Sequence, residues 1–264
     1  MKNKGLVITL IILISILILA LISILVFVIF GNFNINKVFF KNDNINSNVI
    51  FDESYIIDDI ECIDIKSEAG DVIFENSLEN DIRIVAYGKN ENEIKVSLDN
   101  NNIKIDYTGY KRSWFNFDFS RNNIIVYIPN TYSREINIKN EYGNCELIDL
   151  EDASLNIDSN CGNVEISKIK NATIKCDYGN VNIKSIHNKC DIKADCGNVE
   201  IDELQIKENS TIKCDLGNIH ISKINDIYVD ADVDLGNKNI KNDNRNSNIT
   251  LKIKADCGNV IVGD

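Results

Sequence analysis

The chain has 264 residues, of which 44% are hydrophobic, and a formal net charge of −12 at pH 7. Because nucleic acids and anionic lipid headgroups bind concentrated basic surfaces, this charge argues against either as a main partner. The length allows one large domain or two small ones.

A long apolar segment lies near the N-terminus. Residues 6–30 are apolar apart from a few Ser and Thr, and about 20 such residues suffice to cross the hydrocarbon core of a bilayer. The segment is longer than the hydrophobic region of a cleaved signal peptide, so it predicts a retained, single-pass transmembrane helix in the cell membrane. Lys2 and Lys4 place residues 1–5 in the cytoplasm by the positive-inside rule, which makes the rest of the chain extracellular.

The next segments change in character along the chain. Residues 31–55 are rich in asparagine and predict a tether. Residues 108–123 contain a cluster of aromatic residues, which predicts either a segment folded onto the domain or an interaction patch. The aromatic residues are Trp114, Phe115, Phe117 and Phe119. Runs that alternate like strands predict irregular rungs or a β-sheet cap, and they are 82–87, 94–98, 103–107 and 124–128.

A Gly-Asn dipeptide recurs at intervals of 17 to 22 residues in the C-terminal half of the chain. The pairs are Gly143 and Asn144, Gly162 and Asn163, Gly179 and Asn180, Gly197 and Asn198, Gly217 and Asn218, Gly236 and Asn237, and Gly258 and Asn259. Apolar residues alternate on both sides of each pair, and the phase shifts across it. Since Gly adopts positive φ freely and Asn tolerates it, each pair predicts a sharp bend between two short strands.

The repeat therefore predicts an all-β fold. One rung cannot bury its own apolar face, so successive rungs must stack. We expect a single-stranded β-solenoid, or β-helix, with rungs of about 19 residues over residues 56–264, regular from about residue 135. The last bend, at Gly258, lies close to Asp264, which predicts an open strand edge at that end of the solenoid.

Eight cysteines would ordinarily suggest a disulfide framework. The alternation instead places all but Cys62 on the inward face, and no two fall at the same position of adjacent rungs. We therefore predict free cysteines that act as small buried hydrophobic residues. The absence of a Cys-x-x-Cys pair gives no signal for zinc. The inward cysteines are Cys145, Cys161, Cys176, Cys190, Cys196, Cys214 and Cys257.

Two outward positions carry charge in most rungs. An acidic residue usually lies two positions before the glycine, and a lysine usually lies four positions before it. Neighbouring opposite charges compensate each other without a metal, so we predict no metal site. Two rungs are exceptions because they lack the lysine, and a cation such as calcium would be sought there. The acidic residues at those positions are Asp158, Asp232 and Asp234.

No common catalytic motif occurs, and the sequence predicts no enzyme, no catalytic residue and no cofactor. The alternatives are a polysaccharide-active enzyme built on a parallel β-helix and a cation-binding solenoid. The enzyme is disfavoured because the acidic residues repeat on successive rungs instead of breaking the pattern once.

Two motifs resemble a known family. Asp-Cys-Gly-Asn-Val-x-Ile at residues 195–201, which nearly recurs at 256–261, and Ile-Val-Tyr-Ile-Pro at 125–129 resemble the bacterial putative-adhesin domain of unknown function over about residues 56–264. The resemblance implies a β-solenoid, often behind a membrane segment, with a role in adhesion or envelope-stress sensing. We therefore predict a membrane-anchored, surface-exposed, non-enzymatic protein that binds a protein or cell-envelope partner.

Overall fold

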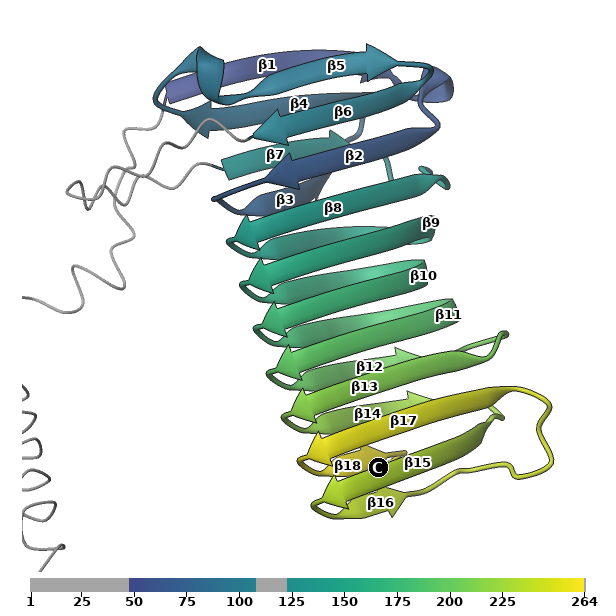
Figure 1. Cartoon of the computed structure of the whole chain (residues 1–264). Coiled ribbons are helices and arrows are strands. Elements are labelled where there is room, and N and C mark those ends of the chain that lie inside the picture. Colours follow the sequence, from purple (N-terminus) through teal and green to yellow (C-terminus); the bar gives the residue numbers. More distant parts are fainter. Residues whose placement is uncertain (1–47, 108–122, 264) are drawn as a thin grey trace, which may run out of the picture. The chain divides into compact units, whose positions relative to one another are not determined.

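A computed structural model describes residues 48–107 and 123–263. Within them, eighteen strands form one continuous sheet, together with two short 3-10 turns at Ile57–Asp59 and Glu91–Glu93. The predicted all-β class is confirmed (Figure 1). No helix among these residues is long and apolar enough to span a bilayer. The predicted membrane helix at 6–30 lies outside the described residues.

The strands divide into a cap and a stack of rungs. The cap contains β1 (Asn48–Ile56), β4 (Asp81–Gly88), β5 (Lys95–Asp99), β6 (Asn102–Tyr107) and β7 (Asn123–Ile128). The first rungs contain β2 (Cys62–Ser67), β3 (Val72–Asn76), β8 (Glu135–Tyr142), β9 (Cys145–Cys161), β10 (Val164–Tyr178) and β11 (Val181–Cys196). The last rungs contain β12 (Val199–Leu204), β13 (Ser210–Leu216), β14 (Ile219–Ile224), β15 (Tyr228–Leu235), β16 (Lys238–Ile240), β17 (Thr250–Cys257) and β18 (Val260–Val262).

The rungs stack in parallel and form two faces that meet at the Gly-Asn corners. One face runs β6, β2, β8, the second half of β9, then the second halves of β10 and β11, β13, β17 and β15. The other face runs β7, β3, the first halves of β9, β10 and β11, then β12, β14, β18 and β16. Figure 1 shows the rungs one above another, as the sequence repeat predicts.

The order of the last rungs differs from the sequence order. β17 pairs with β13 on one side and with β15 on the other, so the C-terminal rung lies between the two rungs that precede it in sequence. β18 is enclosed in the same way by β14 and β16. The predicted open edge therefore belongs to the β15–β16 rung instead of the final one.

The opposite end of the stack is an antiparallel cap. β1 pairs with β4, β4 with β7, and β5 with β6. The tight β5–β6 turn uses Asn100 and Asn101 at positive φ, a conformation that Asn tolerates. The first described strand, β1, begins at Asn48. The boundary predicted at residue 56 is therefore late, because β1 covers residues assigned to the tether.

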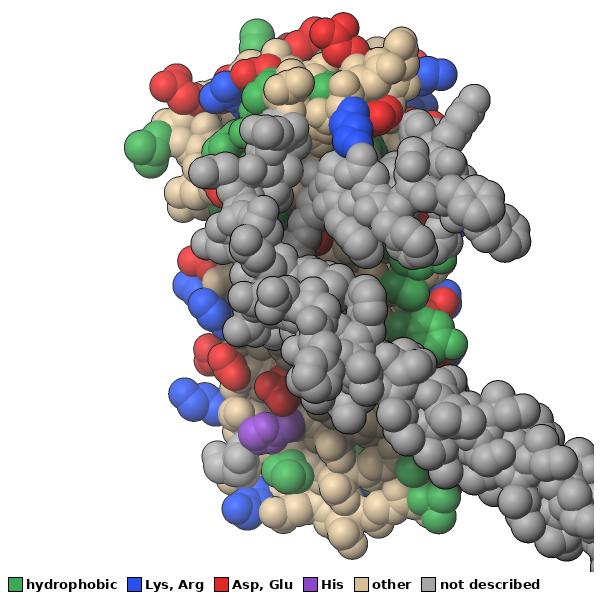
Figure 2. All heavy atoms as spheres, turned by 90° about the vertical axis from the view of Figure 1, so that its left-hand side faces the viewer, with side chains coloured by type: hydrophobic (Ala, Val, Ile, Leu, Met, Phe, Trp, Pro, Cys, Tyr) green, Lys and Arg blue, Asp and Glu red, His purple; other side chains and the backbone are tan. Residues whose placement is uncertain are grey.

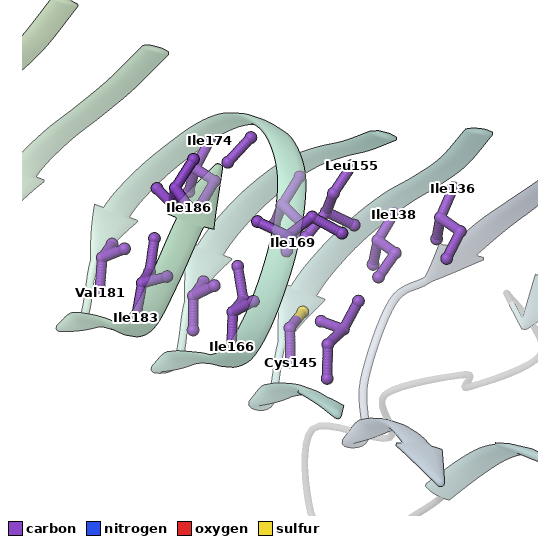
Figure 3. Packing of buried hydrophobic residues seen from close by; sticks show 14 of the residues in the cluster. Ile136, Ile138, Cys145, Leu155, Ile166, Ile169, Ile174, Val181, Ile183 and Ile186 are labelled. Carbon is purple, nitrogen blue, oxygen red and sulfur yellow. The ribbon is translucent and has the colours of Figure 1, made fainter. Parts of the chain in front are cut away.

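The core is a set of stacked aliphatic columns between the two faces. One column runs through Ile138, Ile157, Ile174 and Ile192, each at most 4% exposed, and facing columns come from the other sheet face. Figure 3 shows side chains of both faces, including Ile166 and Ile174, pointing into the space between them. Since each buried Ile contributes roughly 1.5–3 kcal/mol, stacking identical positions stabilises the rungs collectively.

Each corner requires glycine for two reasons. The corner glycines have φ between 138° at Gly143 and 157° at Gly179, which L residues with a Cβ rarely adopt. The rungs also approach closely here, and a Cβ added at Gly197 would overlap the carbonyl oxygen of Gly179. The predicted bends are confirmed at all seven Gly-Asn pairs, and Gly70 makes an eighth bend of the same kind between β2 and β3.

The corner asparagines have a different role from the one predicted. Their φ values are not positive. Except in the last rung of the stack, at Asn237, the side-chain Oδ1 instead accepts a hydrogen bond from the backbone N–H of the asparagine in the next rung, as Asn144 does from Asn163 at 3.0 Å. Asp71 occupies the same position in the first rung and accepts from the N–H of Asn144 at 2.9 Å. The result is a continuous ladder along the corner edge.

All eight cysteines are unbridged, as predicted, but only part of the predicted burial is correct. Four cysteines are buried: Cys145, Cys176, Cys190 and Cys214. Cys161 and Cys196 are half-buried and Cys257 is exposed, all directly before a corner glycine. The inside of the corner is already filled, because the Sγ of Cys176 lies 3.5 Å from the Gly179 carbonyl oxygen. The residue before the glycine therefore has no interior space.

Candidate interaction surface

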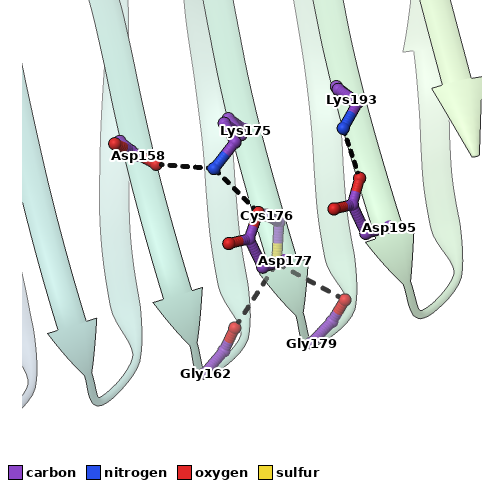
Figure 4. Close-up of polar contacts among 8 residues, drawn as sticks. All are labelled: Asp158, Gly162, Lys175, Cys176, Asp177, Gly179, Lys193 and Asp195. Atoms are coloured by element: carbon purple, nitrogen blue, oxygen red, sulfur yellow. Dashed lines mark hydrogen bonds and ion pairs between the residues drawn. The ribbon is translucent and has the colours of Figure 1, made fainter.

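Lysine and aspartate columns cover the face made by β8, β10, β11, β13 and β17. Within β10, β11, β13 and β17 the lysine pairs with the aspartate two residues later, as Lys175 does with Asp177 at 2.8 Å and Lys193 with Asp195 at 2.6 Å (Figure 4). The same pairing recurs between Lys213 and Asp215 at 2.8 Å and between Lys254 and Asp256 at 3.1 Å. The predicted compensation of the two charge columns is confirmed.

The pair of Lys213 and Asp215 shifts the pKa of both partners. The hydrogen bond from Lys213 lowers the pKa of the Asp215 carboxyl, and the hydrogen bond to Asp215 raises the pKa of Lys213. Both side chains are about one-third exposed. Because water screens such pairs, each contributes little to stability. The face consequently presents fixed, alternating charges.

The three positions considered for cations have lysine neighbours in the structure. Asp158 Oδ1 lies 3.4 Å from the Nζ of Lys175 in the next rung. Asp232 is the register partner of Lys254 on the neighbouring strand. The hydrogen bond to Asp256 is the main cause that raises the pKa of Lys254, and the charge of nearby Asp234 adds to it. Within the described ranges, no group of three or more His, Cys, Asp or Glu side chains could hold a metal ion.

A shallow groove runs along this face. It lies between the lysine column, four residues before each corner glycine, and the column of side chains six residues before that glycine. It spans several rungs, because successive strands contribute equivalent residues to it. Its lining includes Asp64, Lys66, Asn137, Lys139, Asn156 and Thr173. The arrangement can contact an elongated partner at repeated points.

The opposite face carries a less balanced charge. Glu146 and Glu165 are neighbours in register on β9 and β10. Partial burial raises the pKa of Glu146, and the charges of Glu165 and Asp71 add to this effect. Stacked acids of this kind give the second face a negative potential.

The residue directly before each corner glycine forms a column along the corner edge, half-buried or exposed, that the sequence analysis missed. In stack order this apolar corner column consists of Ala69, Tyr142, Cys161, Tyr178, Cys196, Leu216, Cys257 and Leu235. Its large members are more than half exposed, from 55% for Tyr142 to 70% for Leu235. Figure 2 faces this edge, and apolar side chains are visible on it.

Period-two alternation assigned this column to the interior, because it lies an even number of residues from buried positions. The residue types held a contrary signal. The neighbouring inward columns contain mostly Ile, Val, Cys and Ala, whereas this one contains Tyr142 and Tyr178. A large amphipathic ring fits poorly in the narrow end of a rung. The other predicted patch, Trp114, Phe115, Phe117 and Phe119, lies outside the described residues.

The parallel rungs, glycine corners and asparagine ladder define a solenoid-like repeat domain of the all-β class. The family model described as Toastrack DUF4097 matches residues 60–262, and the chain belongs to this family of unknown function. The resemblance expected from the Gly-Asn motifs is therefore confirmed. The chain matches no curated protein.

Solved structures that match the chain at low sequence identity cover most of it. A putative cell adhesion protein from Clostridium sporogenes is 14% identical, with 81% of this chain and 98% of that one covered and a TM-score of 0.34. A putative adhesin from Parabacteroides distasonis is 11% identical, with 83% and 98% covered and a TM-score of 0.47. A putative lipid binding protein from the same organism is 15% identical, with 80% and 96% covered and a TM-score of 0.37. These likenesses are too distant to assign a function.

Proposed function

We propose that the chain is a non-enzymatic interaction protein, displayed outside the cell on a single membrane-spanning anchor, and that it acts in adhesion or in sensing envelope stress. The apolar segment at residues 6–30 and the lysines before it support the anchor and its orientation. Membership of the Toastrack DUF4097 family of unknown function is consistent with this role, as are the names of the putative adhesin and the putative cell adhesion protein to which the chain is similar.

The observation that carries the non-enzymatic part is the repetition of the exposed charges. Lys175 with Asp177 and Lys193 with Asp195 are equivalent pairs on successive rungs. Catalysis needs a unique set of groups whose environments differ, whereas a row of equivalent groups suits contact with an extended partner. The groove along these rungs therefore favours binding over turnover.

Location can be tested with the native thiols. Cys257 is exposed, so a membrane-impermeant maleimide should label it on intact cells that express the full chain. Mass spectrometry of the Cys257 peptide separates this label from that on the half-buried Cys161 and Cys196. A Cys257→Ser chain, which lacks the thiol that is read out, is the matched control. Labelling of Cys257 only after permeabilisation would place the domain in the cytoplasm and reject the proposal.

Binding can be tested separately on the charged face. Reversing the charge of Lys175, Lys193 and Lys213 together should abolish adhesion to cells or matrix, or capture of an envelope partner, while the fold is kept. The matched control reverses the same number of charges on the opposite face, at Glu146, Glu165 and Glu200. Equal loss in both variants would reject the groove as the binding face. Turnover of a polysaccharide that disappears in Asp234→Asn would instead support the enzyme alternative.

A further inference from the structure

The apolar corner column alternates strictly between small and large side chains. Ala69, Cys161, Cys196 and Cys257 are small, and Tyr142, Tyr178, Leu216 and Leu235 separate them. Neighbours along the column belong to adjacent hydrogen-bonded rungs, about 4.8 Å apart. A continuous apolar row whose large members are exposed marks a contact surface.

We propose that this column is the contact between two copies of the chain, packed antiparallel with each large side chain opposite a small one. If Tyr178 of one copy faces Cys196 of the other, the remaining pairs follow from the equal spacing. They are Leu216 with Cys161, Tyr142 with Cys257, and Leu235 with Ala69. All eight positions then fit, and a two-fold axis relates the copies, as in most homodimers.

The repeat distance identifies the partner. One face of an α-helix repeats about every 5.4 Å, so over seven rung spacings of about 4.8 Å it accumulates a mismatch of roughly 4 Å, almost one whole spacing. One side of an extended peptide repeats about every 6.6 Å and loses register within two or three rungs. A second stack of β-rungs keeps the register along the whole column, and this chain provides such a stack.

The flanks of the column allow two copies to approach. On one side lie uncharged corner asparagines such as Asn163 and Asn180. On the other side lie Asp177 and Asp195, whose charges are compensated by lysines of the same strands. Like charges directly opposite would disfavour self-association, and around Tyr178 and Cys196 these flanks largely remove that repulsion.

The size of the surface sets the expected affinity. The column is about 34 Å long, so a standard contact of about 800 Å² per partner needs a width of about 24 Å. A corner edge is narrower than a sheet face, so the contact falls at the small end of specific interfaces. We therefore expect a weak, exchanging dimer, which disulfide trapping can capture. The inference concerns the folded unit and does not depend on the proposed anchor.

Mixed disulfide trapping tests the antiparallel offset, using the full chain in detergent micelles. The first chain carries Cys161→Ser and Cys257→Ser and keeps Cys196. The second carries Cys161→Ser, Cys196→Ser and Cys257→Ser together with Tyr178→Cys. Under mild oxidation the mixture should give a covalent dimer at least tenfold above either chain alone, because neither position faces itself. Moving the new cysteine from Tyr178 to Glu165, on the opposite face, should abolish the dimer.

Two results would overturn the proposal. The first is a mixture that stays monomeric while both chains keep the unfolding midpoint of the wild type. It would show that the column does not join two copies of the chain and would favour a different protein partner. Efficient trapping of the first chain with itself would place Cys196 opposite Cys196, which the proposed antiparallel offset forbids. Adding Leu216→Asp to both chains should also reduce the mixed dimer at least tenfold, and an unchanged yield would contradict the role of the column.

Discussion

The side-chain Oδ1 of Asn163 accepts a hydrogen bond from the backbone N–H of Asn180, 3.0 Å away in the next rung. This bond satisfies a donor at the corner that the β-ladder leaves free, because the chain bends there. The same relationship joins the corner asparagines of neighbouring rungs from Asn144 to Asn237. The corner sequence therefore ties rungs together as well as turning the chain.

Asn163→Ala should destabilise the domain by about 1–3 kcal/mol, because it leaves the partly buried N–H of Asn180 without an acceptor. Asn163→Asp keeps an acceptor oxygen, as Asp71 does naturally in the first rung, so it should cost less than about 1 kcal/mol. Urea unfolding of the three chains measures both values. Equal destabilisation by Ala and Asp would show that the ladder contributes little.

Gly197→Ala should destabilise the domain by more than about 3 kcal/mol, since the new Cβ meets backbone that cannot move aside. The backbone there also has φ of 145°. Lys193→Ala, on the exposed face of the same strand, is the control and should change stability by at most about 0.5 kcal/mol. Thermal unfolding followed by circular dichroism compares them. A Gly197→Ala chain as stable as the control would mean that the rungs can separate at the corner.

The cysteines should divide into two reactivity classes at neutral pH. Cys161, Cys196 and Cys257 are at least partly exposed and should react readily with a maleimide. Burial raises the pKa of Cys145 to about 12 and of Cys176 to about 11, so those thiols should react only after unfolding. Mass spectrometry of native and urea-treated protein identifies the labelled peptides. Fast native labelling of Cys145 would contradict the described core.

Alkaline pH should destabilise the fold through the buried thiols. Burial raises the pKa of Cys176 and of Cys214 to about 11, above an ordinary thiol value near 9. The unfolded chain therefore loses these protons first, and stability is complete below pH 9 and falls as pH rises towards 11. Unfolding midpoints measured between pH 8 and 11 test this.

The matched variant for the alkaline effect is Cys176→Ala with Cys214→Ala. Alanine already occupies the equivalent positions at Ala194 and Ala255, so the corner tolerates it. The double variant should show a shallower loss of stability above pH 9 than the wild type. An identical slope would assign the alkaline effect to other groups.

Calcium at millimolar concentration should not raise the unfolding midpoint, because lysines neighbour the carboxylates considered for binding. Asp232→Asn with Asp234→Asn should behave like the wild type in this assay. A calcium-dependent rise in the wild type that disappears in the double variant would revive the cation-binding alternative.

The sequence alone determined the rung and its period. At each corner the backbone has a positive φ and the neighbouring corner approaches closely, and glycine meets both conditions because it lacks a Cβ. Any other residue would violate this local requirement. The glycine therefore recurs in the sequence as a visible repeat. The alternation of Ile and Val likewise indicates that each strand has one buried face, and this holds whichever strand is its neighbour.

Only the tertiary structure decided which rungs are neighbours and where the apolar corner column points. The insertion of β17 between β13 and β15 depends on which strand edges can meet after a long loop, and alternation does not encode this. The outward side chain of Tyr178 follows from the space inside the corner, which Cys176 already fills. Cys176 and Tyr178 compete for the same space inside the corner. Tyr178 therefore points outward, although the period-two alternation assigns it to the interior.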